Sequence, residues 1–148
     1  MERIHGHCLC GAVAITLHAP KPHVEICHCD MCRRWTGSIY PAIEGESFTL
    51  EGEDAVETYQ SSDWAERAFC RTCGSSLWYT GSSLWYTFLP TGNRSFLAGL
   101  FDAASDLPVK REIFADECTR WIAAPGEHPR LTGAEVIAEA KEAGFSFD

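Results

Sequence analysis

The stretch HGHCLCGAVAITL, residues 5–17, joins a C-x-C pair, Cys8 and Cys10, to a short apolar run. The run at 11–17 contains β-branched residues and predicts a strand. A C-x-x-C pair, Cys70 and Cys73, follows another predicted strand much later in the chain. Structural zinc sites are tetrahedral and are often built from two such pairs, each set on a turn. The four cysteines therefore predict a structural zinc that joins two distant turns and stabilises the fold.

Further short segments with the composition of strands continue through the chain. They are rich in β-branched and aromatic residues and are separated by Gly, Pro or acidic turns, and they cover residues 38–43, 47–52, 55–60, 66–69, 95–101, 111–114 and 119–123. Short loops between them favour antiparallel sheets, so we expect a mainly β fold. No linker divides the sequence, which predicts a single domain over residues 1–148.

A tandem repeat interrupts this pattern: GSSLWYT occurs at residues 74–80 and again at 81–87. In one continuous strand, a shift of seven residues would turn Trp78 and Trp85 to opposite faces. Either a turn at Gly81 and Ser82 makes a hairpin, or a local duplication has lengthened a loop. Both interpretations leave the fold class unchanged.

The end of the chain carries the signature of a helix. Thr132 and Glu135 have the spacing of a capping box, and Gly144 is a typical stop signal. We expect a helix over about residues 133–143. Its predicted buried stripe consists of Val136, Ile137 and Ala140.

A second cysteine group lies in ICHCDMCRRWTGS, residues 26–38, where Cys27, Cys29 and Cys32 form a C-x-C-x-x-C motif. Three protein ligands with a free fourth position are the pattern of a catalytic zinc, whose shell is completed by water or substrate. The motif therefore predicts an open, catalytic zinc site.

The residues after this motif are candidates for substrate binding. Arg33 and Arg34 add positive charge that favours thiolates, and an arginine can hold a substrate carboxylate through two hydrogen bonds. We predict a catalytic and substrate-binding role for both arginines. Thr36 and Ser38 add hydroxyl groups that could orient the same substrate.

Two alternatives to a catalytic site remain open for the cysteine trio. A fourth protein ligand, His28 or Cys118, would make it a second structural site in a non-catalytic zinc module that binds a protein partner. The trio could instead form a reversible disulfide and act as a redox sensor, although the βαβ pattern of thioredoxin-like motifs is absent. His28 stands between two predicted ligands and should face away from them. Cys118 lies in a predicted strand and is expected to be a small buried side chain.

Composition excludes several classes of function. The formal net charge is −9, with 12 Lys+Arg against 21 Asp+Glu, so we expect no nucleic-acid partner. No apolar run approaches the roughly 18 residues that a membrane span needs, and no export signal is evident, so we expect no membrane partner and a cytoplasmic location. Eight cysteines in a reducing compartment favour metal binding or catalysis over disulfides.

Taken together, four segments resemble the glutathione-dependent formaldehyde-activating enzyme family, which includes centromere protein V. They are GHCLCGAVAITL (6–17), CHCDMCRRWTGS (27–38), YQSSDWAERAFCRTCGSSLWY (59–79) and IFADECTRWI (113–122). The resemblance spans about residues 3–125 and leaves out the C-terminal helix. Glu112, where many members carry a histidine, and the doubled GSSLWYT depart from the family pattern.

The resemblance implies a fold and a reaction. The fold is a β-tent, in which Cys8, Cys10, Cys70 and Cys73 hold a structural zinc. The trio would hold a second zinc that meets the thiol of glutathione. The implied activity is that of a carbon–sulfur lyase, which forms and cleaves S-hydroxymethylglutathione from formaldehyde and glutathione. A homodimer is compatible with a small sheet-rich enzyme of this kind.

Overall fold

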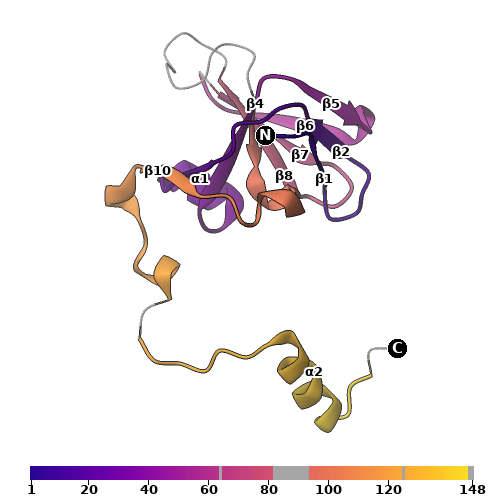
Figure 1. Ribbon diagram of the computed structural model, residues 1–148, viewed down its shortest axis with the longest axis vertical. Helices are drawn as coiled ribbons and strands as arrows, with labels where there is room; N and C mark the ends of the chain where they lie inside the picture. The colour runs from indigo at the N-terminus through magenta and orange to yellow at the C-terminus, as the bar shows by residue number, and fades with distance from the viewer. Residues whose placement is uncertain (64, 82–93, 125, 147–148) are drawn as a thin grey trace.

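The computed structural model describes residues 1–63, 65–81, 94–124 and 126–146 as two β-sheets followed by a tail that ends in a helix (Figure 1). The prediction of a mainly β fold with a short C-terminal helix is confirmed. Trp64 and the second copy of GSSLWYT after Gly81, with Trp85, lie outside the described residues. The choice between a hairpin and a lengthened loop therefore stays open.

The larger sheet has the strand order β10-β3-β4-β9-β8-β7-β6. Its strands in chain order are β3 (Val24–Cys27), β4 (Tyr40–Gly45), β6 (Val56–Ser62), β7 (Ala65–Cys70), β8 (Ser76–Gly81), β9 (Arg94–Leu97) and β10 (Val109–Ile113). Neighbouring strands are antiparallel, except that β10 runs parallel to β3. This parallel pairing places Ile113 opposite Cys27 and so brings a late segment against the cysteine trio.

The smaller sheet has the order β1-β2-β5, from β1 (Ile4–His7), β2 (Ala14–Leu17) and β5 (Phe48–Glu51). Its inward side chains, among them Ile15 and Leu17, share one buried cluster with Ile43 and Phe96 of the larger sheet. Phe96 meets the ring of Phe48 edge-on, with 5.3 Å between the ring centroids. The core therefore lies between the two sheets, because each strand turns alternate apolar residues toward it.

Gly52, in the turn after β5, permits a close approach between two chain segments. Its φ of +81° suits glycine, and a Cβ there would lie 1.8 Å from the backbone oxygen of Ala12. Ala12 belongs to the loop that follows Cys10, so this glycine allows the first cysteine loop to pack against the end of β5.

Short 3₁₀ helices replace two of the predicted strand regions. The 3₁₀ helices of the described residues are η1 (Glu53–Ala55), η2 (Ala98–Leu100), η3 (Asp102–Ala104), η4 (Ala115–Glu117) and η5 (Arg120–Ala123). The two regions concerned are those of η2 and η5. The predicted strand at 95–101 ends at Leu97, and the strand predicted at 119–123 is wrong because η5 occupies it. The β propensity of this late segment does not decide its structure, since no strand pairs with it in the described part of the chain. Cys118, expected to be buried, is exposed after η4.

The C-terminal helix α2 (Gly133–Glu142) has the predicted capping box, in which the hydroxyl of Thr132 accepts a hydrogen bond from the Glu135 amide at 3.2 Å. The prediction of its buried stripe is wrong. Val136 and Ile137 are 49% and 43% exposed, and Ala140 is only partly covered. Figure 1 shows the reason: the tail carries α2 away from both sheets, so the helix has no core to pack against.

No helix in the described ranges combines the length and apolar character needed to cross a membrane.

Candidate functional site

Two loops from distant parts of the chain bring four cysteines together. Cys8 and Cys10 follow β1, whereas Cys70 ends β7 and Cys73 lies in the next turn. Their sulfur atoms all lie within 4.8 Å of one another, with 3.7 Å between Cys8 and Cys10 and 3.8 Å between Cys10 and Cys70. The predicted grouping of these cysteines is therefore confirmed.

Hydrogen-bond donors surround this four-cysteine cluster. The backbone amide of Val13 donates to the sulfur of Cys8 at 3.3 Å, and the Ser75 hydroxyl lies 3.2 Å from the sulfur of Cys73. The hydroxyl of Ser75 is the main reason that the pKa of Cys73 is lowered to about 5. Such donors stabilise the charged form of the thiol at Cys73, whereas the pKa of Cys10 is raised to about 11.

The second cluster comes from one continuous segment. Cys27 ends β3, Cys29 is the N-cap of α1 (Asp30–Thr36), and Cys32 lies in the first turn of that helix. The backbone amide of Cys32 donates to the sulfur of Cys29 at 3.4 Å. The C-x-C-x-x-C spacing thus spans a strand end and a helix start, and it brings the three sulfur atoms within 4.8 Å of one another.

Because these sulfur atoms lie so close together, their thiols have very different pKa values. The Cys27 and Cys32 thiols donate toward the sulfur of Cys29 and lower its pKa to about 2. The same contacts, chiefly that with Cys29, raise the pKa of Cys27 well above its ordinary value. One thiolate is therefore favoured without a metal ion, and three thiolates would require a positive charge between them.

His28 lies between two cysteines of the trio but is not grouped with their sulfur atoms. Its side chain is buried, and its Nε2 atom lies 2.6 Å from a carboxylate oxygen of Glu112 on β10. Its backbone amide also donates to the carbonyl oxygen of Ile113 at 3.1 Å. As predicted, His28 faces away from the trio, where it connects the cysteine segment to β10.

The trio opens into a cavity of about 370 Å³. Apolar and aromatic side chains line much of it, including Met31, Tyr40, Tyr79 and Ile113. Its size and lining are typical of a small-molecule site. Burial raises the pKa of Tyr40, whose hydroxyl donates to the carbonyl oxygen of Ser95, so this phenol stays neutral.

Arg67 on β7 contributes a buried positive charge to the cavity. The side chain is only 4% exposed, and both Nη atoms lie 3.8 Å from the sulfur of Cys32. Its Nε atom donates to the Ser61 hydroxyl at 3.2 Å. The guanidinium also lies over the rings of Trp35 and Tyr79, 5.0 and 5.1 Å from their centroids. Arg67 is not among the site residues predicted from the sequence.

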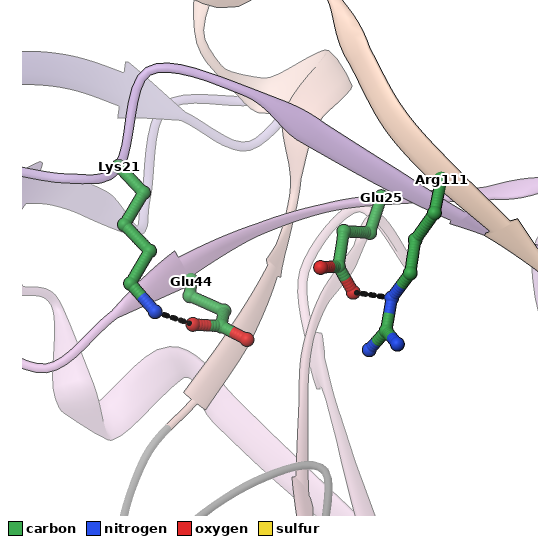
Figure 2. Close-up of polar contacts among 4 residues, drawn as sticks. All are labelled: Lys21, Glu25, Glu44 and Arg111. Carbon is green, nitrogen blue, oxygen red and sulfur yellow. Dashed lines mark hydrogen bonds and ion pairs between the residues drawn. The ribbon is translucent and has the colours of Figure 1, made fainter.

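Charged residues in the lining of the same cavity take part in two ion pairs, which Figure 2 shows. Arg111 on β10 pairs with Glu25 on β3 at 3.2 Å. Lys21 pairs with Glu44 on β4 at 3.0 Å. Both carboxylates and Arg111 line the cavity, whose lining therefore combines cysteine sulfur atoms with charged side chains.

The four residues predicted to bind substrate lie elsewhere. Arg33, Arg34 and Thr36 belong to α1, and Ser38 follows it, but none of them is among the residues that line the cavity. The Thr36 hydroxyl donates to the carbonyl oxygen of Ile39 at 3.0 Å and accepts a hydrogen bond from the Ser38 amide at 3.1 Å. These bonds shape the turn after α1. The role of all four residues in substrate binding stays a prediction.

Both clusters have a donor set that suits zinc. Four ligands at about 2.3 Å in a tetrahedron have sulfur atoms about 3.8 Å apart. The sulfur separations of 3.7 and 3.8 Å in the four-cysteine cluster match this geometry. The trio supplies three soft ligands beside a cavity, which is the arrangement of a site with a free position.

Comparison with known proteins identifies the family of this chain. Residues 3–117 match the model of the family described as "Glutathione-dependent formaldehyde-activating enzyme". The chain belongs to this family. The resemblance inferred from the cysteine motifs is therefore confirmed, and the α2 tail lies beyond the match.

Two curated relatives and one solved structure are similar to the chain. An "uncharacterized lyase" of Schizosaccharomyces pombe is 34% identical over 80 residues, covering 53% of this chain and 58% of the relative. A "putative glutathione-dependent formaldehyde-activating enzyme" of Halomonas elongata is 31% identical over 85 residues, covering 51% of this chain and 54% of the relative. The matches thus span just over half the length of these relatives. A crystal structure of a Rhodobacter sphaeroides protein shares the fold, with a TM-score of 0.54 and 23% identity, covering 72% of this chain and 99% of that one.

Proposed function

We propose that the protein is a zinc-dependent carbon–sulfur lyase that joins a small thiol to an aldehyde and cleaves the same adduct. Formaldehyde and glutathione are the proposed pair, which would make the product S-hydroxymethylglutathione. The single observation that carries the proposal is the cysteine trio in the lining of a cavity with aromatic walls, with a buried cation beside it. Family membership supports the same class of reaction.

The two cysteine clusters would hold different zinc ions. Cys8, Cys10, Cys70 and Cys73 would hold a structural zinc, because they form a complete tetrahedral set. Cys27, Cys29 and Cys32 would hold a second zinc with a free position. When bound there, zinc supplies the positive charge that keeps a neighbouring thiol ionised at neutral pH.

The reaction itself needs little from the protein beyond orientation and charge. The thiolate sulfur of the substrate forms a bond to the carbonyl carbon of the aldehyde, and the carbonyl electron pair moves to oxygen, which takes a proton from water. Cleavage is the reverse: the hydroxyl proton leaves, the C=O bond reforms and the C–S bond breaks. The apolar walls at Met31, Tyr40 and Tyr79 would restrict water around the sulfur atoms of the trio.

The residues that would bind the polar groups of the thiol substrate include four predicted from the sequence and one that lines the cavity. Arg33, Arg34, Thr36 and Ser38 are the candidates from the sequence. The cavity adds Arg111, whose guanidinium is partly exposed beside Glu25, as a cation that a substrate carboxylate can reach.

Zinc stoichiometry and activity together test the proposal. We expect two zinc ions per chain in the wild type and one in Cys29→Ser, with the formaldehyde–glutathione reaction lost in that variant. Cys118→Ser is the matched control because this cysteine is exposed and belongs to neither cluster, so both zinc ions and activity should remain. A rate no faster than the spontaneous reaction in fully zinc-loaded wild type would reject this activity. One zinc, unchanged by Cys29→Ser, would instead favour a redox sensor or a non-catalytic module.

A further inference from the structure

Arg67 is a buried cation whose surroundings point to an anionic ligand. A buried guanidinium costs free energy unless negative charge or hydrogen bonds compensate it. Its hydrogen-bond partners in the described part of the chain are a neutral hydroxyl, that of Ser61, and the sulfur of Cys32. Two aromatic rings hold the rest of the group. The groups that its two Nη atoms face are therefore the sulfur atoms of the trio, with Cys32 at 3.8 Å.

We propose that Arg67 binds the sulfur of the substrate, and thereby allows the trio site to take up an additional thiolate. This inference rests on the proposed function. Three cysteine thiolates around a dication leave one negative charge, and a further thiolate would raise it to two in a cavity with apolar walls. One fixed guanidinium beside the sulfur atoms offsets the added charge.

The contacts of Arg67 prepare it for this role before any substrate binds. Ser61 holds Nε, and the two rings hold the guanidinium on its faces, so its orientation is fixed. Both Nη atoms are directed to the sulfur side, at 3.8 Å from Cys32. A planar fork held in this way can meet two sulfur atoms at once, whereas a lysine ammonium is not held by the same contacts.

Cobalt(II) in place of zinc provides a test that does not depend on turnover, because thiolate–cobalt absorption reports each sulfur ligand. Glutathione, 2-mercaptoethanol and imidazole are titrated into cobalt-loaded wild type, Arg67→Met, Arg67→Lys and Arg130→Met, with Cys29→Ser as the blank for the trio site. Arg130 is the control, since it removes the same charge from the exposed tail. Melting temperature and bound cobalt are recorded for each variant.

We expect Arg67→Met to weaken binding of both thiols roughly 10- to 100-fold, the scale of a lost hydrogen bond to a charged group. Neutral imidazole should bind all variants within about threefold, since the added ligand brings no charge. Arg67→Lys should weaken the thiols less, by about 3- to 10-fold, because it keeps the charge but loses the fork. Arg130→Met should match the wild type.

Each contrary result has its own meaning. Wild type that takes up cobalt at the trio but binds neither thiol overturns the proposed function, and this inference with it. Wild type that binds thiols while Arg67→Met binds them equally well overturns the role of Arg67 alone. Weakened glutathione binding with unchanged 2-mercaptoethanol binding would place Arg67 on a carboxylate instead of the sulfur. If Arg67→Met does not fold, thiol affinity of Arg67→Lys equal to wild type overturns the inference.

Discussion

The two cysteine clusters use the same side chain in opposite settings. The four-cysteine cluster joins loops that are 60 residues apart, and the backbone and Ser75 donate hydrogen bonds to its sulfur atoms. The trio comes from one segment at the start of α1, faces a cavity and has a full positive charge, Arg67, beside it. The cysteines of the first cluster come from two distant loops, whereas all three cysteines of the second come from one short segment.

This difference separates structural from chemical use of cysteine. A site completed by four protein ligands ties distant parts of the chain together, so metal binding there adds directly to folding free energy. A site with three local ligands stabilises only the segment that carries it, but it leaves a position free for a substrate.

The strongest test compares loss of one cysteine from each cluster. Cys70→Ser should abolish the proposed metal site between the two loops and lower the melting temperature by more than about 10 °C, since a structural zinc contributes several kcal/mol. Cys29→Ser should lower it by less than about 3 °C, because serine can also cap a helix and is close to cysteine in size. Calorimetry with metal analysis measures both. Equal shifts in the two variants would remove the distinction between the clusters.

A second test strains the first cysteine loop without touching a cysteine. Gly52→Ala places a Cβ 1.8 Å from the Ala12 oxygen at a φ of +81°, so the loop after Cys10 must move. We expect a loss of about 3 kcal/mol in unfolding free energy and weaker retention of the structural metal. Gly99→Ala is the control, because a Cβ there meets no atom within 4 Å, and it should change stability by less than about 0.5 kcal/mol. Urea unfolding that gives the same value for both variants would contradict the proposed packing.

A third test addresses the contact that supports the trio. Glu112→Ala removes the 2.6 Å partner of buried His28 and should cost about 1–2 kcal/mol, because the imidazole nitrogen loses its hydrogen bond. Glu112→Gln keeps a hydrogen-bonding group and should recover most of the loss. Cobalt titration of the trio should show weaker binding in Glu112→Ala, with the four-cysteine site unchanged. Weakened binding at both sites would show that the variant loosens the whole fold.

The sequence predicted the two clusters because cysteine spacing is a local property. Three sulfur atoms within six positions meet whenever a strand end turns into a helix, and two short pairs on turns are a recognisable ligand set. Sequence reasoning could not find Arg67, whose burial depends on β7, β8 and α1 coming together. One signal was available: strand alternation places Arg67 on the face opposite Glu66, together with the small residue Ala65.

The wrong predictions for residues 119–123 and for the stripe of α2 have the same cause, because both depend on tertiary contacts. The segment 119–123 has strand-like composition, but a strand needs a partner, and the nearby chain forms η5 instead. The stripe of α2 has helical spacing, and its capping box formed as predicted, yet whether Val136 and Ile137 are buried depends on what lies opposite them. Local chemistry determined where the helix begins, and tertiary contacts determined its exposure.

The smallest effect is expected for removal of the tail. A chain that ends at Ala124 loses α2, whose apolar residues Val136 and Ile137 are already exposed, so folding loses little buried apolar surface. Its melting temperature and its two metal sites should equal those of the full chain, within about 2 °C for the former, because both clusters lie within residues 8–73. The matched control is Val136→Ser with Ile137→Ser in the full chain, which removes the stripe but keeps the tail. If truncation and the double substitution both lowered stability, α2 would pack on the sheets in solution. If only truncation lowered stability, the residues between Ala124 and α2 would contribute to it. The tail would then stabilise the fold in addition to the two cysteine clusters.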